Sequence, residues 1–315
     1  MCLQTENRPA GASLPVECAG GHDLPTDASL MGSTFTIPDL LRSFAGRSGI
    51  AALSSRLIHS PRTLRILIYH DVPASLFCHF ESHLAWLSQR FEFARPDELI
   101  RETSPGNRPR ILLTFDDGCS DNYATVAPLL ESYGARGLFF VCPGFADLSR
   151  QESLRLMERS AAIMGATNRD SRWERLSRAQ IIDLDRRGHG IGSHTMTHVP
   201  LARVTEDETI KEVEECAALL ASWLEHPCHY FAWTYSWDEI TPKSLKLALD
   251  CHKFCFSPCS GLNPWPHPPR LLWRTAVDVS KPLPYLQTQI SGLPDQAYRS
   301  KRAWLKQMRR SVAAP

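Results

Sequence analysis

Residues Ile111 to Gly118 read ILLTFDDG, an apolar strand that runs directly into two adjacent carboxylates and a glycine. Neighbouring residues at the end of a strand point in different directions, so Asp116 and Asp117 can take different roles, one binding a metal and the other staying free. A simple turn without any function is the alternative interpretation of this stretch, because Gly118 can adopt positive φ and the carboxylates can be solvated. Taken alone, this stretch favours the turn.

The chain around this stretch alternates short β-branched and aromatic runs with longer segments whose apolar residues recur three and four apart. Strands are predicted at 65–69, 110–115, 137–141, 190–193, 229–233, 253–257 and 271–277. Helices are predicted at 79–90, 122–133, 178–187, 206–225 and 242–249. Repeated strand-then-helix units are typical of a mostly parallel sheet, so we expect an α/β fold. Thr205, followed three residues later by Glu208, predicts a capping box at the start of one helix.

The composition is that of an ordinary globular protein, since 35 Lys and Arg against 34 Asp and Glu leave a net charge of +1. This balance provides no general field for phosphate polymers, so no nucleic-acid partner is expected. No run approaches the roughly 18 apolar residues of a transmembrane helix. The N-terminal letters lack the pattern of a signal peptide, so a cytoplasmic location with reduced thiols is predicted.

Changes in composition and in apolar pattern divide the chain into three regions. Residues 1–60 are an extension of uncertain order, 61–282 hold the regular alternation, and 283–315 are a basic tail. An excursion at 145–174 interrupts the alternation and has no readable role. The tail predicts a basic amphipathic helix. Weak contact with an anionic membrane surface is a minority hypothesis for it, and a solvated tail is the commoner case.

Two imidazoles stand four residues apart in GIGSHTMTH, from Gly190 to His198. In an extended strand four residues span roughly 13 Å, too far for one ion, whereas a helical turn brings such side chains to about 5 to 6 Å. A turn is therefore required between His194 and His198. Two imidazole nitrogens and one Asp oxygen suit a divalent ion such as Zn²⁺ and leave a place for water. Histidines that only cap a polar turn are the alternative, and the upstream acidic pair weighs against it.

Together these motifs resemble the polysaccharide deacetylase family, also called the NodB-homology domain or carbohydrate esterase family four. The stretches that carry the resemblance are TFDDG at 114–118, SHTMTH at 193–198 with its lead-in GHGIG at 188–192, Tyr69-His70, FAWTY at 231–235 and PRL at 269–271. The resemblance covers about residues 64–279. It implies a distorted (β/α) barrel, related to the TIM barrel, with about seven parallel strands and a catalytic role for region 61–282.

By this resemblance, Asp117, His194 and His198 hold a divalent metal, most often Zn²⁺, with Co²⁺ or another ion as an alternative. Asp116 is then the general base for the attacking water, and the backbone N–H of Tyr235 meets the oxyanion. The implied activity is removal of an N-acetyl group from an amino sugar in a polysaccharide, oligosaccharide or glycan precursor.

The sequence departs from the family in its third and last motifs. Thr234 and Ser236 replace the usual proline and glycine around the tyrosine, which predicts a less rigid oxyanion loop. No Leu-x-His triplet, the usual source of the acid for the leaving amine, follows Trp233. His267 is the nearest candidate by position, although a solvent-facing loop histidine is the commoner case. Arg270 is predicted to orient Asp116, with a surface arginine as the alternative.

Aromatic residues around the predicted site suggest substrate contacts. Trp233 and Trp237 alternate along the chain with Tyr235, so one face could offer platforms to sugar rings, while core packing explains the same spacing. Tyr69 and His70, after the first strand, are further predicted substrate-binding residues. Two rival functions stay open: a catalytically silent glycan-binding protein on the same fold, and a metal hydrolase acting on another amide or ester.

Overall fold

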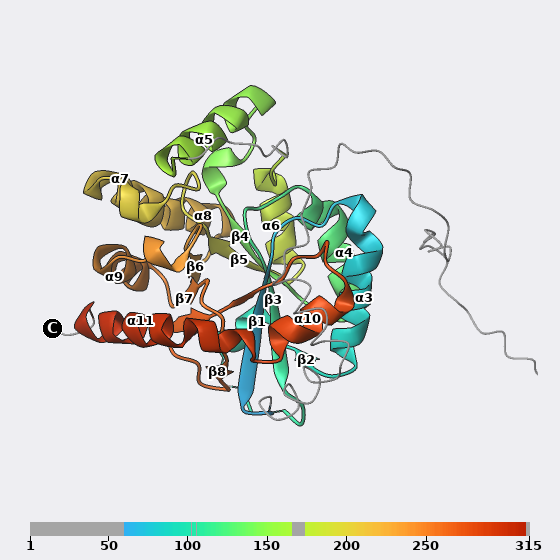
Figure 1. The fold of residues 1–315 in the computed structure, drawn as a ribbon. Helices are drawn as coiled ribbons and strands as arrows, with labels where there is room; N and C mark the ends of the chain where they lie inside the picture. The colour runs from blue at the N-terminus through green and yellow to red at the C-terminus, as the bar shows by residue number, and fades with distance from the viewer. Residues whose placement is uncertain (1–59, 102, 105, 166–173, 313–315) are drawn as a thin grey trace, which may run out of the picture. The chain divides into compact units, whose positions relative to one another are not determined.

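The computed structural model describes residues 60–312 apart from residues 102, 105 and 166–173. In Figure 1 the strands lie at the centre of this region and the helices surround them. The strands are β1 (Thr63–Tyr69), β2 (Glu92–Phe93), β3 (Arg110–Phe115), β4 (Leu138–Val141), β5 (Gly190–Ser193), β6 (Tyr230–Ala232), β7 (Phe254–Ser257), β8 (Asn263–Pro264), β9 (Leu271–Trp273) and β10 (Thr275–Ala276). The α-helices are α3 (Phe77–Ser88), α4 (Ala127–Ser132), α5 (Arg150–Ile163), α6 (Arg178–Arg186), α7 (Glu206–Ile210), α8 (Cys216–Leu224), α9 (Pro242–Cys251), α10 (Leu283–Ile290) and α11 (Arg299–Val312).

The sheet is a nearly closed, mostly parallel barrel. Its strand order is β10-β1-β3-β4-β5-β6-β7-β9, and neighbours along this path are parallel. Only Arg274 separates β9 from β10, so one segment pairs with β7 through its first part and with β1 through its second. Short β2 extends the sheet beside β3, and β8 runs antiparallel to the start of β1. The distorted (β/α) barrel predicted from the sequence is confirmed.

The predicted elements match the observed ones closely. Each predicted strand overlaps an observed strand, and the Thr205–Glu208 capping box is formed. Two of the predicted helices contain a π-helical turn, η3 (Asn122–Val126) before α4 and η6 (Lys211–Glu215) between α7 and α8. The excursion contains α5, whose start is fixed by a capping box of Ser149 with Glu152.

Alternation along the strands decides which side chains enter the barrel. Leu112 belongs to the interior cluster with Phe140, whereas Leu113 belongs to the cluster that packs against the outer helices. The same alternation directs Asp116 inward at the carboxyl end of β3 and His194 inward after β5. Gly192 makes room for this packing, because a Cβ there would stand 2.6 Å from the Phe140 ring.

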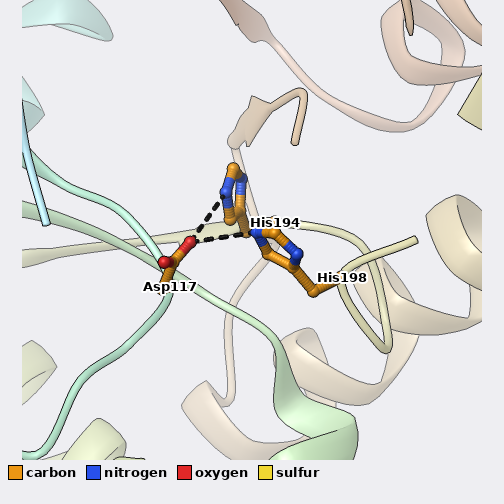
Figure 2. Close-up of side chains that lie close together, drawn as sticks. All are labelled: Asp117, His194 and His198. Carbon is orange, nitrogen blue, oxygen red and sulfur yellow. Dashed lines mark ion pairs between the residues drawn. The ribbon is translucent and has the colours of Figure 1, made fainter. Parts of the chain in front are cut away.

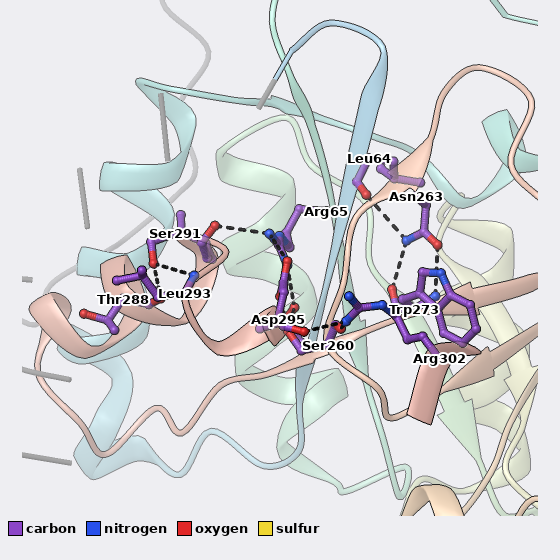
Figure 3. Close-up of polar contacts among 12 residues, drawn as sticks. Leu64, Arg65, Ser260, Asn263, Trp273, Thr288, Ser291, Leu293, Asp295 and Arg302 are labelled. Carbon is purple, nitrogen blue, oxygen red and sulfur yellow. Dashed lines mark hydrogen bonds and ion pairs between the residues drawn. The ribbon is translucent and has the colours of Figure 1, made fainter. Parts of the chain in front are cut away.

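A buried polar network attaches the C-terminal helices to the barrel wall (Figure 3). Fully buried Arg65 of β1 donates to both carboxylate oxygens of Asp295, at 2.9 and 3.0 Å. Ser260 also donates to Asp295, at 2.6 Å, and Arg302 of α11 donates to the Asp295 carbonyl at 2.9 Å. Removing one partner of the buried Arg65–Asp295 ion pair would cost about 3–5 kcal/mol, and the Arg302 bond links α11 to this pair.

The apolar face of α11 lies against the barrel. Leu305 and Met308 are buried in the cluster that contains Trp233 and Trp273. The domain boundary at 282/283 stays a prediction, and residues 1–59 of the predicted extension lie outside the described residues. No helix among the residues that the structure describes has the length and apolar character needed to cross a bilayer.

Candidate metal centre

Three predicted ligands converge at the carboxyl ends of β3 and β5 (Figure 2). His198 Nε2 lies 3.1 Å and His194 Nε2 lies 3.4 Å from Asp117 Oδ1. All three ligand atoms stand within 4.8 Å of one another. Around a tetrahedral ion with bonds of about 2.0–2.2 Å, neighbouring ligand atoms stand ~3.3–3.5 Å apart. The side chains therefore fit a divalent ion with little rearrangement.

The backbone at this centre has an unusual conformation. Asp117, Thr195 and His198 have φ values of 73°, 63° and 58°, in the left-handed region. Such conformations are uncommon outside glycine and persist only where surrounding contacts hold them. Thr195 and His198 lie in the sharp turn after β5, which brings the two imidazole rings to a centroid distance of 5.3 Å. The turn that the four-residue histidine spacing requires is present.

Hydrogen bonding sets the state of the ligands. The Ala232 carbonyl lies 2.9 Å from His194 Nδ1, and because a carbonyl only accepts, we assign the proton of the neutral ring to Nδ1. That assignment leaves Nε2 free to bind a cation. Burial disfavours the charged form of Asp117, but the nearby His198 and His194 imidazoles, in their protonated forms, hold its pKa well below the usual range. The carboxylate is therefore ionised at neutral pH.

Asp116 forms a buried ion pair with Arg274, which sequence reasoning missed. The guanidinium donates to the two carboxylate oxygens at 2.7 and 2.9 Å, and both residues are almost fully buried. Arg274 also donates to Thr114 Oγ1 at 3.2 Å and lies 5.0 Å from the centre of the Phe140 ring. No signal in the sequence indicated it, because Arg274 lies inside the predicted strand 271–277, and only the structure shows that β9 ends at Trp273, directly before it.

Arg270 does not contact Asp116, and that prediction is wrong. Its guanidinium donates to backbone carbonyls, including those of His252 at 2.7 Å and Lys253 at 3.3 Å, beside the amino end of β9. Arg270 is exposed, as the alternative interpretation of a surface arginine predicts. Only the three residues of β9 separate Arg270 from Arg274, so the two arginines lie at opposite ends of this strand.

His267 also lies away from the centre. It is exposed on the loop between β8 and β9. This loop is at the amino end of the barrel, because β8 pairs with Thr63 and Leu64 at the start of β1. The structure therefore does not bring His267 to the site as a proton donor.

A cavity of about 310 Å³ opens beside Asp117. Its lining consists of Tyr69, His70, Asp71, Asp117, Cys119, Val277, Asp278 and Val279. His70 is an exposed imidazole in this lining, and Asn122 Nδ2 donates to its carbonyl at 3.1 Å. Tyr69 is almost fully buried, with its hydroxyl 3.3 Å from His83 Nδ1. Of the two, His70 is the one placed to meet a ligand.

The aromatic residues of the third motif have separate environments. Trp233 is buried and its indole N–H donates to Ser244 Oγ, as core packing requires. Tyr235 is 38% exposed, and its ring lies 4.9 Å from that of His198. Trp237 meets Trp304 of α11 edge to face, with ring centres 5.8 Å apart.

Two polar contacts support this motif and the metal loop. Thr234, in place of the family's proline, is buried and donates to the Val199 carbonyl at 2.8 Å. The hydroxyl thus ties the Tyr235 loop to the residue after His198. From α5, Ser160 contacts both the His198 carbonyl and the Tyr235 hydroxyl. The excursion therefore contributes a residue to the surroundings of the metal centre.

The cysteines among the described residues differ in state. Seven are free thiols, and all of these except Cys251 are buried. Cys78 is disulfide-bonded, so the prediction that the thiols are reduced is wrong at that residue.

Fold and site together define an α/β barrel with a candidate divalent-metal centre at the carboxyl ends of its strands. Residues 103–248 match the model of the family described as polysaccharide deacetylase, which confirms the resemblance drawn from the motifs.

Known proteins with related sequences or folds agree with this match. A Bacillus subtilis (strain 168) protein named "Putative polysaccharide deacetylase YxkH" is 24% identical over 168 residues, covering 50% of this chain and 52% of its own length. The chain thus spans about half of that relative. The Streptococcus pyogenes deacetylase PplD, solved with acetate, has a TM-score of 0.54 at 21% identity and covers 73% of this chain and 99% of its own. IcaB from Ammonifex degensii has a TM-score of 0.56 at 21% identity, covering 74% and 97%. At this identity the two structures show a shared fold.

Proposed function

We propose that the protein is a metal-dependent hydrolase that removes an acetyl group from an N-acetylated amino sugar in a glycan or glycan precursor. The observation that carries the proposal is the convergence of Asp117, His194 and His198 at the end of the barrel where Asp116 is held by Arg274. The family match over residues 103–248 supports the same chemistry.

Zn²⁺ is our proposed ion, because two neutral imidazoles and one carboxylate form a common catalytic zinc set. When bound, such an ion supplies Lewis acidity, which polarises an acetyl carbonyl and lowers the pKa of water. Co²⁺ or another divalent ion would suit the same donors.

Asp116 is the proposed general base. Its carboxylate would accept a proton from the attacking water, while the bidentate bond to Arg274 fixes its orientation. Arg274 therefore acts through Asp116 as a positioning residue.

The Tyr235 N–H is the proposed donor to the oxyanion of the tetrahedral intermediate. No acceptor for it occurs among the backbone hydrogen bonds of the described residues, and the Thr234 bond holds its loop.

His70 is the proposed general acid in place of His267. It lines the same cavity as Asp117, and an imidazole can donate a proton to a leaving group within its reach. In this role His70 would protonate the departing amine as the carbon–nitrogen bond breaks.

Trp237 and Trp304 are the proposed contacts for sugar units beyond the reacting one. Trp304 is 44% exposed, and Trp237 is two residues from Tyr235, so the pair can extend the site along a glycan. The cytoplasmic location and the weak membrane contact of the tail stay predictions.

The test is acetate release from N-acetylglucosamine oligomers by the zinc-loaded protein. Asp116→Asn should reduce turnover by about 10²-fold or more, because general-base assistance contributes that much, and should leave the zinc content unchanged. Unchanged turnover in this variant would refute the assigned base. Glycan binding without acetate release from a broad panel of acylated sugars would instead support a silent binding protein. Turnover of other amides or esters, without acetate release from amino sugars, would support a metal hydrolase with a different substrate.

A further inference from the structure

A buried carboxylate accepts hydrogen bonds from the loop that carries both histidines. Glu212, 6% exposed, accepts from the Thr197 N–H at 2.7 Å and from the Thr197 hydroxyl at 2.6 Å. Thr197 directly precedes His198. A carboxylate that accepts two hydrogen bonds from one residue fixes both the peptide plane and the side chain of that residue.

Glu212 reaches Thr197 from η6, the π-helical turn between α7 and α8. Such turns are rare inside α-helices and are frequent at functional sites. The other π-helical turn among the described helices, η3, has a similar relation to the site, because its first residue, Asn122, donates to the His70 carbonyl. Both irregular turns thus contact a loop at the carboxyl end of the barrel.

The loop that carries His194 and His198 needs contacts from other segments to keep its conformation. Thr195 and His198 both have positive φ, which unrestrained residues of these types rarely adopt. Glu212 accepts from Thr197, one of the two residues between them, and Ser160 of α5 contacts the His198 carbonyl. Without these contacts the loop could relax towards ordinary backbone angles and move His198 away from Asp117.

We propose that Glu212 is a positioning residue that holds His198 in the geometry that binds the metal, acting through Thr197. The inference rests on the proposed function, because it concerns the same centre. Hydrogen-bonded residues behind metal ligands typically contribute about 10–100-fold to metal affinity. We expect Glu212→Ala to weaken zinc binding by about 10-fold or more for this reason.

The experiment measures zinc affinity by competition with a chromophoric chelator, together with the melting temperature of the metal-free protein. Glu214→Ala is the matched control, since Glu214 belongs to the same π-helical turn and is exposed. Glu212→Gln should restore most of the affinity. Its amide carbonyl can accept from the Thr197 N–H, and the Thr197 hydroxyl can rotate to accept from the amide group.

Thr197→Val gives a second route if Glu212→Ala does not fold. It keeps the backbone bond, removes the hydroxyl and changes a half-buried side chain, so the fold should tolerate it, and zinc affinity should again fall. Weaker zinc binding in Glu212→Ala or Thr197→Val, with wild-type affinity in Glu214→Ala, supports the proposal. Zinc affinity within about threefold of the control in every folded variant overturns it, whatever happens to the melting temperature. If the wild-type protein takes up no divalent ion, the proposed function and this inference both fail.

Discussion

Replacing Arg274 with methionine would remove the guanidinium that bonds both oxygens of Asp116 inside the barrel, at 2.7 and 2.9 Å. The remaining carboxylate would be 4% exposed with its cation gone. Removing one partner of a buried ion pair costs about 3–5 kcal/mol, because the other charge is left uncompensated. In a domain of this size each kcal/mol lowers the melting temperature by about 2–4 °C, so we expect a decrease of ~6–20 °C.

A double-mutant cycle with Asp116→Asn isolates the pair. Urea unfolding of the wild type, both single variants and the double variant should show that the double variant loses less stability than the two single losses combined. Arg159→Met is the control. Arg159 forms an exposed ion pair with Glu208, and such pairs contribute little to stability. Additive losses, or an Arg274→Met loss below about 1 kcal/mol, would refute the claim that the buried pair positions Asp116.

Further predictions concern the acid, the substrate platform, pH and the metal. His70→Gln should slow hydrolysis of N-acetyl sugars by about 10²-fold but barely slow that of an aryl acetate, whose leaving group needs no proton; equal loss on both substrates would argue against an acid role. Trp304→Ala should raise KM for long oligomers and leave KM for the dimer unchanged, and an equal change for both would exclude an outer sugar contact. Burial, as the largest cause, lowers the pKa of His83, His189 and His252 to about 4. In the unfolded chain these histidines bind protons near pH 6.5, so the free energy of unfolding should be highest above that pH and fall towards pH 4. The decrease should reach up to about 1.4 kcal/mol per pH unit for each histidine. His189→Gln should make this slope shallower, and urea unfolding at several pH values tests this. Free zinc at about 100 times its Kd should stabilise the fold by about 2.7 kcal/mol relative to chelator-treated protein, and identical melting curves would contradict specific binding.

Local patterns in the sequence, with the family resemblance that they carry, were enough to predict the strands, most helices and the candidate metal centre. Asp117, His194 and His198 lie next to strand ends, so one short-range rule places all three at one end of a barrel. The position of Asp116 follows from the same alternation. These residues could be found because their roles depend on neighbours a few positions away.

The remaining parts of the site depend on contacts between distant segments. Asp116 and Arg274 are far apart in sequence, and only closure of the barrel by β9 and β10 shows that Arg274, and not Arg270, reaches the carboxylate. Ser160 and Glu212 likewise lie in separate helices, and no pattern in the sequence predicts that these helices approach the loop of His198.

The sequence by itself thus determined the parallel strands, the acidic strand end and the histidine turn, because strand alternation and turn geometry are local properties of the chain, while the family resemblance of its motifs implied the barrel. The tertiary structure decided which cation faces Asp116, which imidazole shares the cavity with Asp117, and what holds the strained loop. Those choices depend on how strands and helices pack, since packing brings together groups that are far apart along the chain.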